Sequence, residues 1–76
     1  MKLTKTEKFA LDFLRKAWRD RPEPMLTVHS PYGLMRASYY TKFTRGVEFW
    51  GKVLKKLEKK GFVKKDKNTE IWYITK

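Results

Sequence analysis

The residues of this sequence that are most able to do chemistry are basic side chains in the segment 44–60, TRGVEFWGKVLKKLEKK. At about 100° per residue, as in an α-helix, these side chains fall on one arc and apolar side chains fall on the opposite arc. The apolar arc contains Val47, Trp50, Val53, Leu54 and Leu57. The basic arc contains Arg45, Lys52, Lys55, Lys56, Lys59 and Lys60, with Phe49 near one end. The pattern predicts a helix that buries the first arc and attracts a polyanion with the second.

Residues at both ends of this segment are suited to delimiting a helix. Thr44 is the expected N-cap, with Thr41 as the alternative, because a hydroxyl oxygen can accept a hydrogen bond from a free backbone N–H group. Gly61 is suited to the left-handed residue that ends a helix. Gly46 and Gly51 each cost about 1 kcal/mol of helix propensity relative to Ala. We expect packing to compensate, for example through the close approach of another backbone.

Catalytic and metal-binding side chains are sparse. The sequence has no cysteine and one histidine, His29, which excludes disulfides, thiolate metal sites and zinc fingers. No pair of carboxylates has metal-binding spacing, and no glycine-rich loop is suited to cradling a phosphate. We therefore expect no enzyme, no cofactor and no bound metal. His29 is expected to be a surface strand residue or a minor phosphate contact.

The charge of the chain is strongly positive and uneven. The net charge is +11 over 76 residues, and residues 42–76 carry eleven Lys and Arg against four acids, whereas residues 1–41 carry eight against four. Such a field concentrates phosphate-bearing partners, so nucleic acid is the first expectation and an anionic membrane surface the second. No apolar run approaches the ~20 residues of a membrane span, and MKLTKTEK lacks the apolar core of a signal peptide. We expect one domain over residues 1–76 that is intracellular, in the cytoplasm or nucleoid, and makes no membrane contact.

The first part of the chain reads as helix, short strand and helix. Thr4 and Glu7 have the spacing of a capping box, which predicts a helix over residues 5–20. The apolar face of that helix would be Ala10, Phe13, Leu14, Ala17 and Trp18. Residues 25–29 are extended in character and predict a strand with Val28 inward. Ser30 and Pro31 are typical of an N-cap and first turn, and predict a second helix that ends at about Ser38.

The end of the chain predicts a β-hairpin with a charged tip. Residues 62–65 and 70–75 are rich in strand formers, and the polar residues 66–69 between them are typical of a turn. Because neighbouring side chains in a strand point to opposite faces, either Trp72 or Tyr73 must face outward. Trp18 and Trp50 are expected in the core.

This order of elements resembles the winged helix-turn-helix family. LKKLEKKGFVKKDKNTEIWYIT is similar to the family's pattern of spaced leucines, a Gly and apolar step into the first strand, a charged wing and an aromatic, aliphatic and Thr close. The resemblance implies an α+β fold of three helices, one short strand and a C-terminal antiparallel β-hairpin wing. It also implies duplex DNA binding, sequence-specific or general, by a small transcriptional regulator. The helix at 44–60 would dock in the major groove, with wing contacts from residues 64–69.

Matching positions imply a set of DNA-binding residues. Arg45 is the best candidate for reading a base, because its guanidinium can bond guanine O6 and N7 together. Lys52 and Lys56 are better suited to clamping phosphates. Phe49 could contact a thymine methyl group, or fold against Phe43 or Tyr40. One of the two adjacent tyrosines is expected to be buried. The full set is Tyr39, Tyr40, Lys42, Thr44, Arg45, Phe49, Lys52, Lys56, Lys64, Lys65, Lys67 and Asn68.

Other functions remain open at this point. The same fold could serve as a protein-interaction module in a larger assembly, because a fold does not fix a function. Its interface aromatics would then be Phe9, Phe43, Phe49 and Trp72. RNA or replication-origin binding could use the same basic surface. The sequence also leaves open a homodimer formed through the first helix or the wing.

Overall fold

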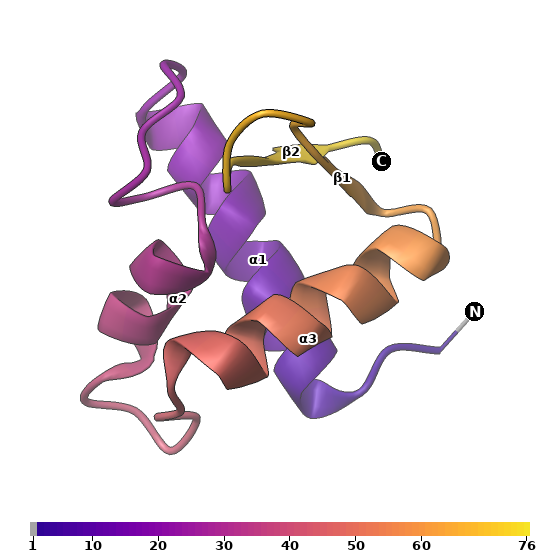
Figure 1. Ribbon diagram of the computed structural model, residues 1–76. Helices are drawn as coiled ribbons and strands as arrows, with labels where there is room; N and C mark the ends of the chain where they lie inside the picture. The colour runs from indigo at the N-terminus through magenta and orange to yellow at the C-terminus, as the bar shows by residue number, and fades with distance from the viewer. Residues whose placement is uncertain (1) are drawn as a thin grey trace.

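Three helices followed by a two-stranded antiparallel hairpin make up the fold, so the expected α+β class is confirmed (Figure 1). The structure is a computed structural model and describes residues 2–76. The elements are α1 (Lys5–Asp20), α2 (Pro31–Ser38), α3 (Val47–Lys59), β1 (Val63–Lys65) and β2 (Trp72–Ile74). Within residues 2–76, no helix has both the length and the apolar character needed to cross a membrane.

The start of α1 is fixed by the predicted capping box. The hydroxyl oxygen of Thr4 accepts a hydrogen bond from the backbone N–H of Glu7 at 3.1 Å. The Glu7 carboxylate in return accepts one from the backbone N–H of Thr4 at 2.9 Å. These two bonds satisfy donors that the first turn of a helix leaves free, and the predicted bounds of α1 are confirmed.

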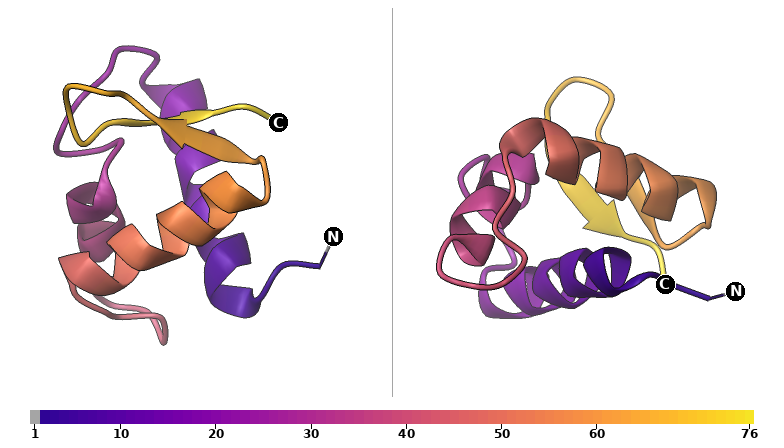
Figure 2. Two further views of the ribbon diagram at one scale, coloured as in Figure 1. Left: turned by 45° about the vertical axis from the view of Figure 1, so that its right-hand side comes forward. Right: turned by 90° about the horizontal axis from the view of Figure 1, so that it is seen from below.

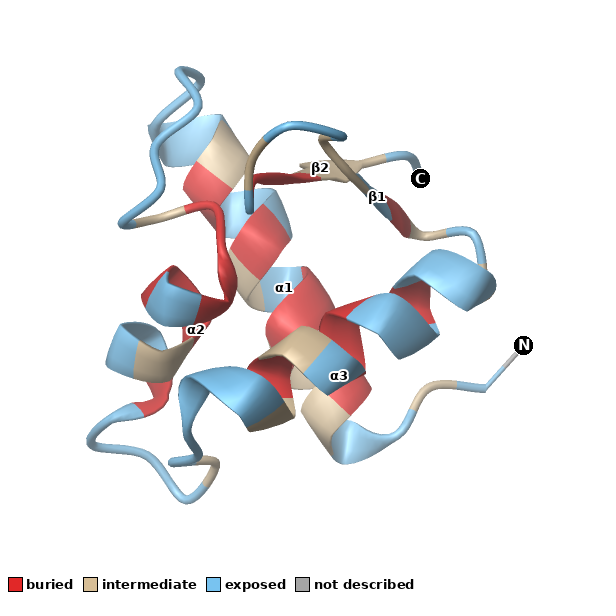
Figure 3. Ribbon diagram, viewed as in Figure 1, coloured by how far each residue is buried: buried red, intermediate tan, exposed pale blue. Residues whose placement is uncertain are grey.

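The core forms where α1, α3 and the hairpin meet, and Figure 3 shows their facing sides as buried. Trp50 of α3 and Trp72 of β2 are its largest buried side chains. Leu11, which lies on a flank of the predicted apolar face of α1, is also buried. Val47 was expected in the core but is 40% exposed, because it is the first residue of α3 and lies beyond the packed turns. The remaining members of the predicted apolar arc are buried: Trp50, Val53, Leu54 and Leu57.

The strand predicted at residues 25–29 is wrong. The backbone N–H groups of Val28 and His29 both donate to the carbonyl of Met25, at 3.0 and 2.8 Å, so the segment closes into a turn. A single backbone hydrogen bond, from Trp72 N–H to the His29 carbonyl at 2.8 Å, joins this turn to the hairpin. Val28 is half-buried.

His29 is buried, which contradicts the expected surface position. Its Nδ1 accepts a hydrogen bond from the backbone N–H of Met25 at 3.1 Å, and its Nε2 lies 3.3 Å from the carbonyl oxygen of Ala17. These partners assign the neutral tautomer with its proton on Nε2. The ring stacks on Trp18 with centroids 3.9 Å apart. His29 is therefore a structural residue that fastens the turn to α1.

The hairpin buries one face, as predicted by strand alternation. Its register pairs Val63 with Ile74, Lys64 with Tyr73 and Lys65 with Trp72. Trp72 is 2% exposed and Tyr73 lies on the opposite face, where it stacks on Trp18 at 4.9 Å. The strands span residues 63–65 and 72–74, slightly less than the predicted 62–65 and 70–75. Backbone hydrogen bonds still flank them, from Thr75 N–H to the Phe62 carbonyl and from Asp66 N–H to the Ile71 carbonyl, both at 2.9 Å.

The glycines behave differently from expectation in two cases. Gly61 has φ of +85° and ends α3 as predicted. The expected backbone approach is not found at Gly46, which is the N-cap of α3, or at Gly51, where the nearest atom to an added Cβ is a side-chain carbon of Pro31 at 3.9 Å. The close approach occurs at Gly33 in α2, where an added Cβ would lie 2.1 Å from the carbonyl oxygen of Val28.

Candidate nucleic-acid interface

The outward side of α3 carries four exposed lysines, which we call the α3 lysine face: Lys52, Lys55, Lys56 and Lys59. They lie opposite the buried side that contains Trp50 and Leu54. Within the described chain, the ion pairs join Arg19 to Asp20, Lys60 to Glu7, and Lys65 to Glu70, and none involves this face. The face therefore keeps its full charge for an external partner.

Lys60 does not belong to this face, although the helical wheel placed it there. Its ammonium donates to the Glu7 carboxylate at 2.7 Å, and the Glu7 side chain is only 3% exposed. The hydrogen bond from Lys60, together with the one from the Thr4 backbone, lowers the pKa of Glu7 despite the opposing effect of burial. This pair links the first turn of α1 to the C-terminal end of α3.

The α3 lysine face and the hairpin tip lie on the same side of the molecule. In the right-hand view of Figure 2, α3 lies along one edge, α1 lies along the opposite edge, and the loop between β1 and β2 projects past α3. A long anionic partner placed against α3 would therefore meet the hairpin tip. It would not meet the exposed side of α1.

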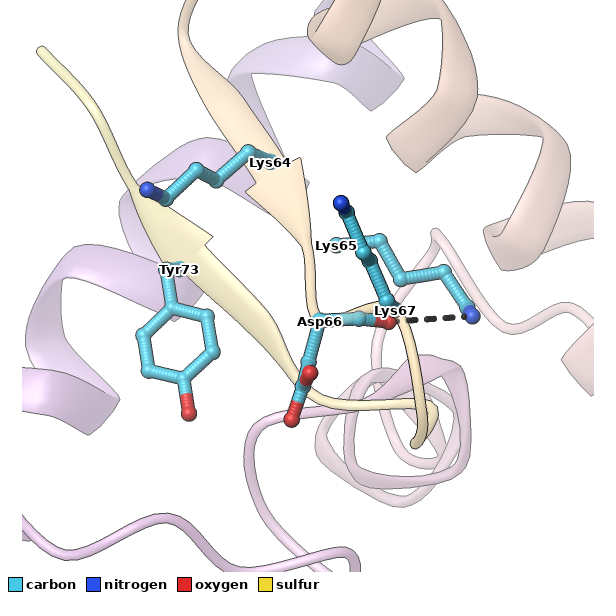
Figure 4. A pocket seen from close by; sticks show the side chains of 5 residues that line it. All are labelled: Lys64, Lys65, Asp66, Lys67 and Tyr73. Carbon is cyan, nitrogen blue, oxygen red and sulfur yellow. Dashed lines mark hydrogen bonds between the residues drawn. The ribbon is translucent and has the colours of Figure 1, made fainter.

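The hairpin tip is ordered by Asp66, whose carboxylate accepts hydrogen bonds from Asn68 N–H at 3.3 Å and the Thr69 hydroxyl at 3.1 Å. Lys67 and Asn68 are exposed on this tip. A hollow of about 460 Å³ lies beside the tip. Figure 4 shows the side chains that line it: Lys64, Lys65, Asp66, Lys67 and Tyr73.

The two strand lysines differ in their availability. Lys65 is half-buried on the Trp72 side of the hairpin, and its ammonium lies 3.3 Å from the Asp66 carbonyl (Figure 4). The same ammonium lies 3.6 Å from the Glu70 carboxylate. Lys64 is exposed, but it shares the opposite face with Tyr73. The structure therefore brings Lys67 and Asn68 to the tip, partly occupies Lys65 with internal partners, and turns Lys64 away from the core-facing side.

The start of α3 differs from the prediction, because neither threonine is its N-cap. Gly46 occupies that position without a side-chain hydrogen bond. The Thr44 hydroxyl instead lies 2.7 Å from each of the carbonyl oxygens of Ser38, Tyr39 and Thr41. The Thr41 hydroxyl donates to the Ser38 carbonyl at 2.8 Å. Free carbonyls at the end of α2 therefore take both hydroxyls, and α3 begins at Val47 rather than near residue 44.

Arg45 lies in the connection before α3, folded back on its own neighbours. Its guanidinium donates to the Thr44 carbonyl at 2.7 Å and lies 5.5 Å from the centre of the Phe49 ring. Phe49 is half-buried and packs edge-on against Trp50 at 5.2 Å. The expected packing of Phe49 against Phe43 or Tyr40 is not found, since Phe43 pairs with Phe9 at 4.9 Å.

Tyr39 and Tyr40 are both exposed, at 61% and 93%, so the expectation that one is buried is wrong. Their rings contact each other at 4.6 Å in an edge-to-face arrangement. Lys42, on the same connection, extends over the ring of Phe43 at 5.6 Å.

Of the aromatics proposed for a protein interface, one is buried and three are half-buried. Trp72 is buried, and Phe9, Phe43 and Phe49 pack against the core cluster. Sequence reasoning missed a different apolar hollow of about 280 Å³, lined chiefly by Leu26, Pro31, Tyr32 and Val47 with Glu70 at its edge. Its residues come from three separate segments, and no local pattern relates them.

Residues 2–76 contain no group of three or more His, Asp or Glu side chains placed to hold a metal ion. Comparison with known proteins gave no match to a family model, to a curated sequence or to a solved structure.

Proposed function

We propose that this chain is a winged-helix domain that binds duplex DNA, with α3 docked in the major groove and the β1–β2 hairpin acting as the wing. The observation that supports this most directly is the α3 lysine face, which is free of internal ion pairs and lies on the same side as the hairpin tip. The major groove of B-DNA is wide enough to admit an α-helix, and α3 exposes one whole side to such a partner. By occupying a promoter in this way, the protein would act as a small transcriptional regulator.

Like-charge repulsion along α3 is one reason to propose a polyanionic partner for it. The exposed lysines of α3 have the spacings at which side chains of a helix are neighbours. Four residues separate Lys52 from Lys56 and Lys55 from Lys59, and three residues separate Lys52 from Lys55 and Lys56 from Lys59. Each such like-charge pair destabilises a helix by about 0.2–0.5 kcal/mol. Phosphate groups would remove this repulsion and release their own counterions.

Individual residues are assigned different tasks in this proposal. Lys52 and Lys56 would contact phosphates through the centre of α3. Arg45 would read a guanine edge. To reach that edge, its guanidinium would first have to break its hydrogen bond to the Thr44 carbonyl. Lys67 and Asn68 would touch the flanking backbone. Tyr39, Tyr40 and Lys42 lie on the connection that precedes α3 and would lie beside the duplex.

Fluorescence anisotropy with a labelled duplex across a salt series tests the proposal. If about five phosphates are neutralised, log affinity falls against log salt with a slope of roughly −4 to −5. The triple variant Lys52→Ala/Lys55→Ala/Lys56→Ala should bind more weakly and reduce the slope by about 2 to 3.

The matched control is Lys5→Ala/Lys8→Ala/Lys16→Ala, which removes the same charge from exposed positions of α1. It should retain most of the affinity and nearly all of the slope, because α1 lies on the opposite side. Equal losses in the two triple variants would show that only net charge matters, and would contradict α3 as the DNA-binding surface.

A protein-interaction module is the second candidate, and the apolar hollow beside Val47 and Tyr32 is the observation that favours it. Val47 and Leu26 are 40% and 55% exposed there. An apolar surface of this kind suits a protein partner or a second copy of the chain. The duplex titration separates the two functions, because an interaction module predicts no salt-dependent binding to DNA.

A further inference from the structure

Two large aromatic rings at the end of α2 have faces that the rest of the protein does not cover. Tyr40 is 93% exposed and Tyr39 is 61% exposed. The rings meet at an interplanar angle of 67°, so they form the two walls of a notch. Exposing the flat apolar faces of these rings to water is unfavourable. A ligand that covers the faces would therefore gain free energy by binding there.

The notch continues into a hollow of about 440 Å³, lined by Met35, Arg36, Tyr39 and Tyr40. Met35 is half-buried and packs against the core, which supports one side of the hollow. Arg36 is exposed, and its guanidinium lies 5.9 Å from the centre of the Tyr32 ring. A flat ligand in the hollow would therefore meet aromatic faces and a cation together.

The segment that carries the hollow has charged residues of one sign. No acidic residue occurs between Glu23 and Glu48, whereas Arg36, Lys42 and Arg45 occur in the same interval. All three of these basic residues are exposed. The surface therefore matches a ligand that carries both aromatic faces and negative charge.

We propose that this surface, the tyrosine platform of Tyr39, Tyr40 and Arg36, stacks an unpaired base of single-stranded nucleic acid. Bases inside a duplex cover one another's faces and offer only their edges, so they cannot use a tyrosine face. An unpaired base offers its face for stacking and its phosphate for Arg36 or Lys42. This proposal rests on the proposed function only in taking nucleic acid as the ligand. The platform would bind nucleotides that α3 does not bind.

The platform is fastened to the start of α3. The Thr44 hydroxyl lies 2.7 Å from the carbonyl oxygens of Ser38 and Tyr39, which ties the connection back onto the end of α2. The tyrosines therefore do not swing freely on a loop. With the backbone held in this way, chiefly side-chain freedom is lost when a base stacks on a ring.

Two double variants separate stacking from hydrogen bonding by the tyrosine hydroxyls. Tyr39→Phe/Tyr40→Phe keeps both ring faces and removes the hydroxyls, whereas Tyr39→Leu/Tyr40→Leu removes the faces. Both side chains are exposed, so the fold should survive each change, and circular dichroism checks this. The probe is a short oligothymidylate that contains one 2-aminopurine, whose fluorescence is quenched when it stacks.

We expect wild type and the phenylalanine variant to quench the probe and to bind it with affinities within about twofold of each other. The leucine variant should lose the quenching and bind about tenfold more weakly, which corresponds to about 1.4 kcal/mol. An oligouridylate with the same reporter base tests whether the source of the base is DNA or RNA, and quenching by either supports the platform. Three results would overturn it: no binding of single strands by wild type, unchanged binding by the leucine variant, or equal losses in both double variants.

The duplex titration keeps this proposal apart from the function proposed for α3. This titration uses wild type and a fully paired duplex, which offers no unpaired base to the tyrosines. If duplex binding is absent while wild type quenches the single-strand probe, the α3 proposal fails and the platform stands. If duplex binding is present without quenching, the platform fails alone.

Discussion

Replacing Glu7 with Gln would test whether the pair with Lys60 fastens α3 to α1. The Glu7 carboxylate accepts hydrogen bonds from Lys60 Nζ at 2.7 Å and from Thr4 N–H at 2.9 Å. Glutamine keeps an oxygen for Thr4 but removes the negative charge. The Lys60 side chain, which is 25% exposed, would then lack its counter-charge.

The expected cost lies between two known limits. Breaking a fully buried ion pair costs about 3–5 kcal/mol, and breaking an exposed one costs up to about 1 kcal/mol. One partner here is buried and the other is partly exposed, so we expect the variant to lose about 2 kcal/mol of unfolding free energy. For a domain of this size, the melting temperature should fall by about 10 °C.

The pH dependence gives a second, independent readout. Because the pKa of Glu7 is lowered in the folded protein, its contribution to stability is present above the ordinary glutamate pKa of about 4.3. That contribution is lost as the pH falls from about 4.3 through the lower folded value. The difference between wild type and Glu7→Gln should therefore be largest at neutral pH and shrink as the pH falls through the lowered pKa of Glu7.

Urea denaturation at several pH values, from acid to neutral, measures both effects. Glu23→Gln is the matched control, because Glu23 is an exposed loop residue that forms no ion pair within residues 2–76. It should change stability by less than about 0.5 kcal/mol at every pH. Equal effects of the two substitutions at pH 7, or a difference from wild type that does not change with pH, would refute the role given to the pair.

Three further substitutions, all followed by urea denaturation, test the packing of α2 and of the turn before it. Gly33→Ala should lose about 2 kcal/mol or more, because its Cβ would lie 2.1 Å from the Val28 carbonyl oxygen, whereas Gly51→Ala should gain up to about 1 kcal/mol from helix propensity. A similar change at both glycines would contradict the close approach at Gly33. His29→Phe keeps a flat ring in the aromatic stack but leaves the Met25 N–H without its acceptor, and should lose about 2 kcal/mol. An unchanged midpoint for His29→Phe would show that stacking alone fixes the turn.

The parts of the fold that sequence predicted are those set by neighbours in the chain. The capping box of Thr4 and Glu7, and Ser30 before Pro31, identified the starts of α1 and α2. Gly61 identified the end of α3. In each case the hydrogen-bonding partner lies within about one helical turn, so the spacing of residue types carries the information. The alternation of Trp72 and Tyr73 has the same local origin.

The errors occur where distant or competing partners decide the outcome. Residues 25–29 resemble a strand by composition, but His29 prefers partners on α1 and closes a turn instead. Thr44 has the properties of an N-cap, but its hydroxyl lies next to free carbonyls at the end of α2. It therefore does not cap α3, whose N-cap is Gly46. Lys60 belongs to the basic arc by periodicity, and only tertiary packing shows that Glu7 neutralises it. Helical periodicity assigns a side of a helix but not what lies opposite it.

The size of the molecule relates the two proposed surfaces to each other. Its Cα atoms extend 28 Å along the longest axis, which is less than the ~34 Å of one turn of B-DNA. The α3 lysine face and the tyrosine platform would therefore meet nucleotides within one turn of each other. The Thr44 hydroxyl holds the connection between them against the end of α2, which keeps the two surfaces close together. Together, the two proposals describe a protein suited to the boundary between paired and unpaired strands, where a duplex for α3 and an exposed base for Tyr40 occur side by side.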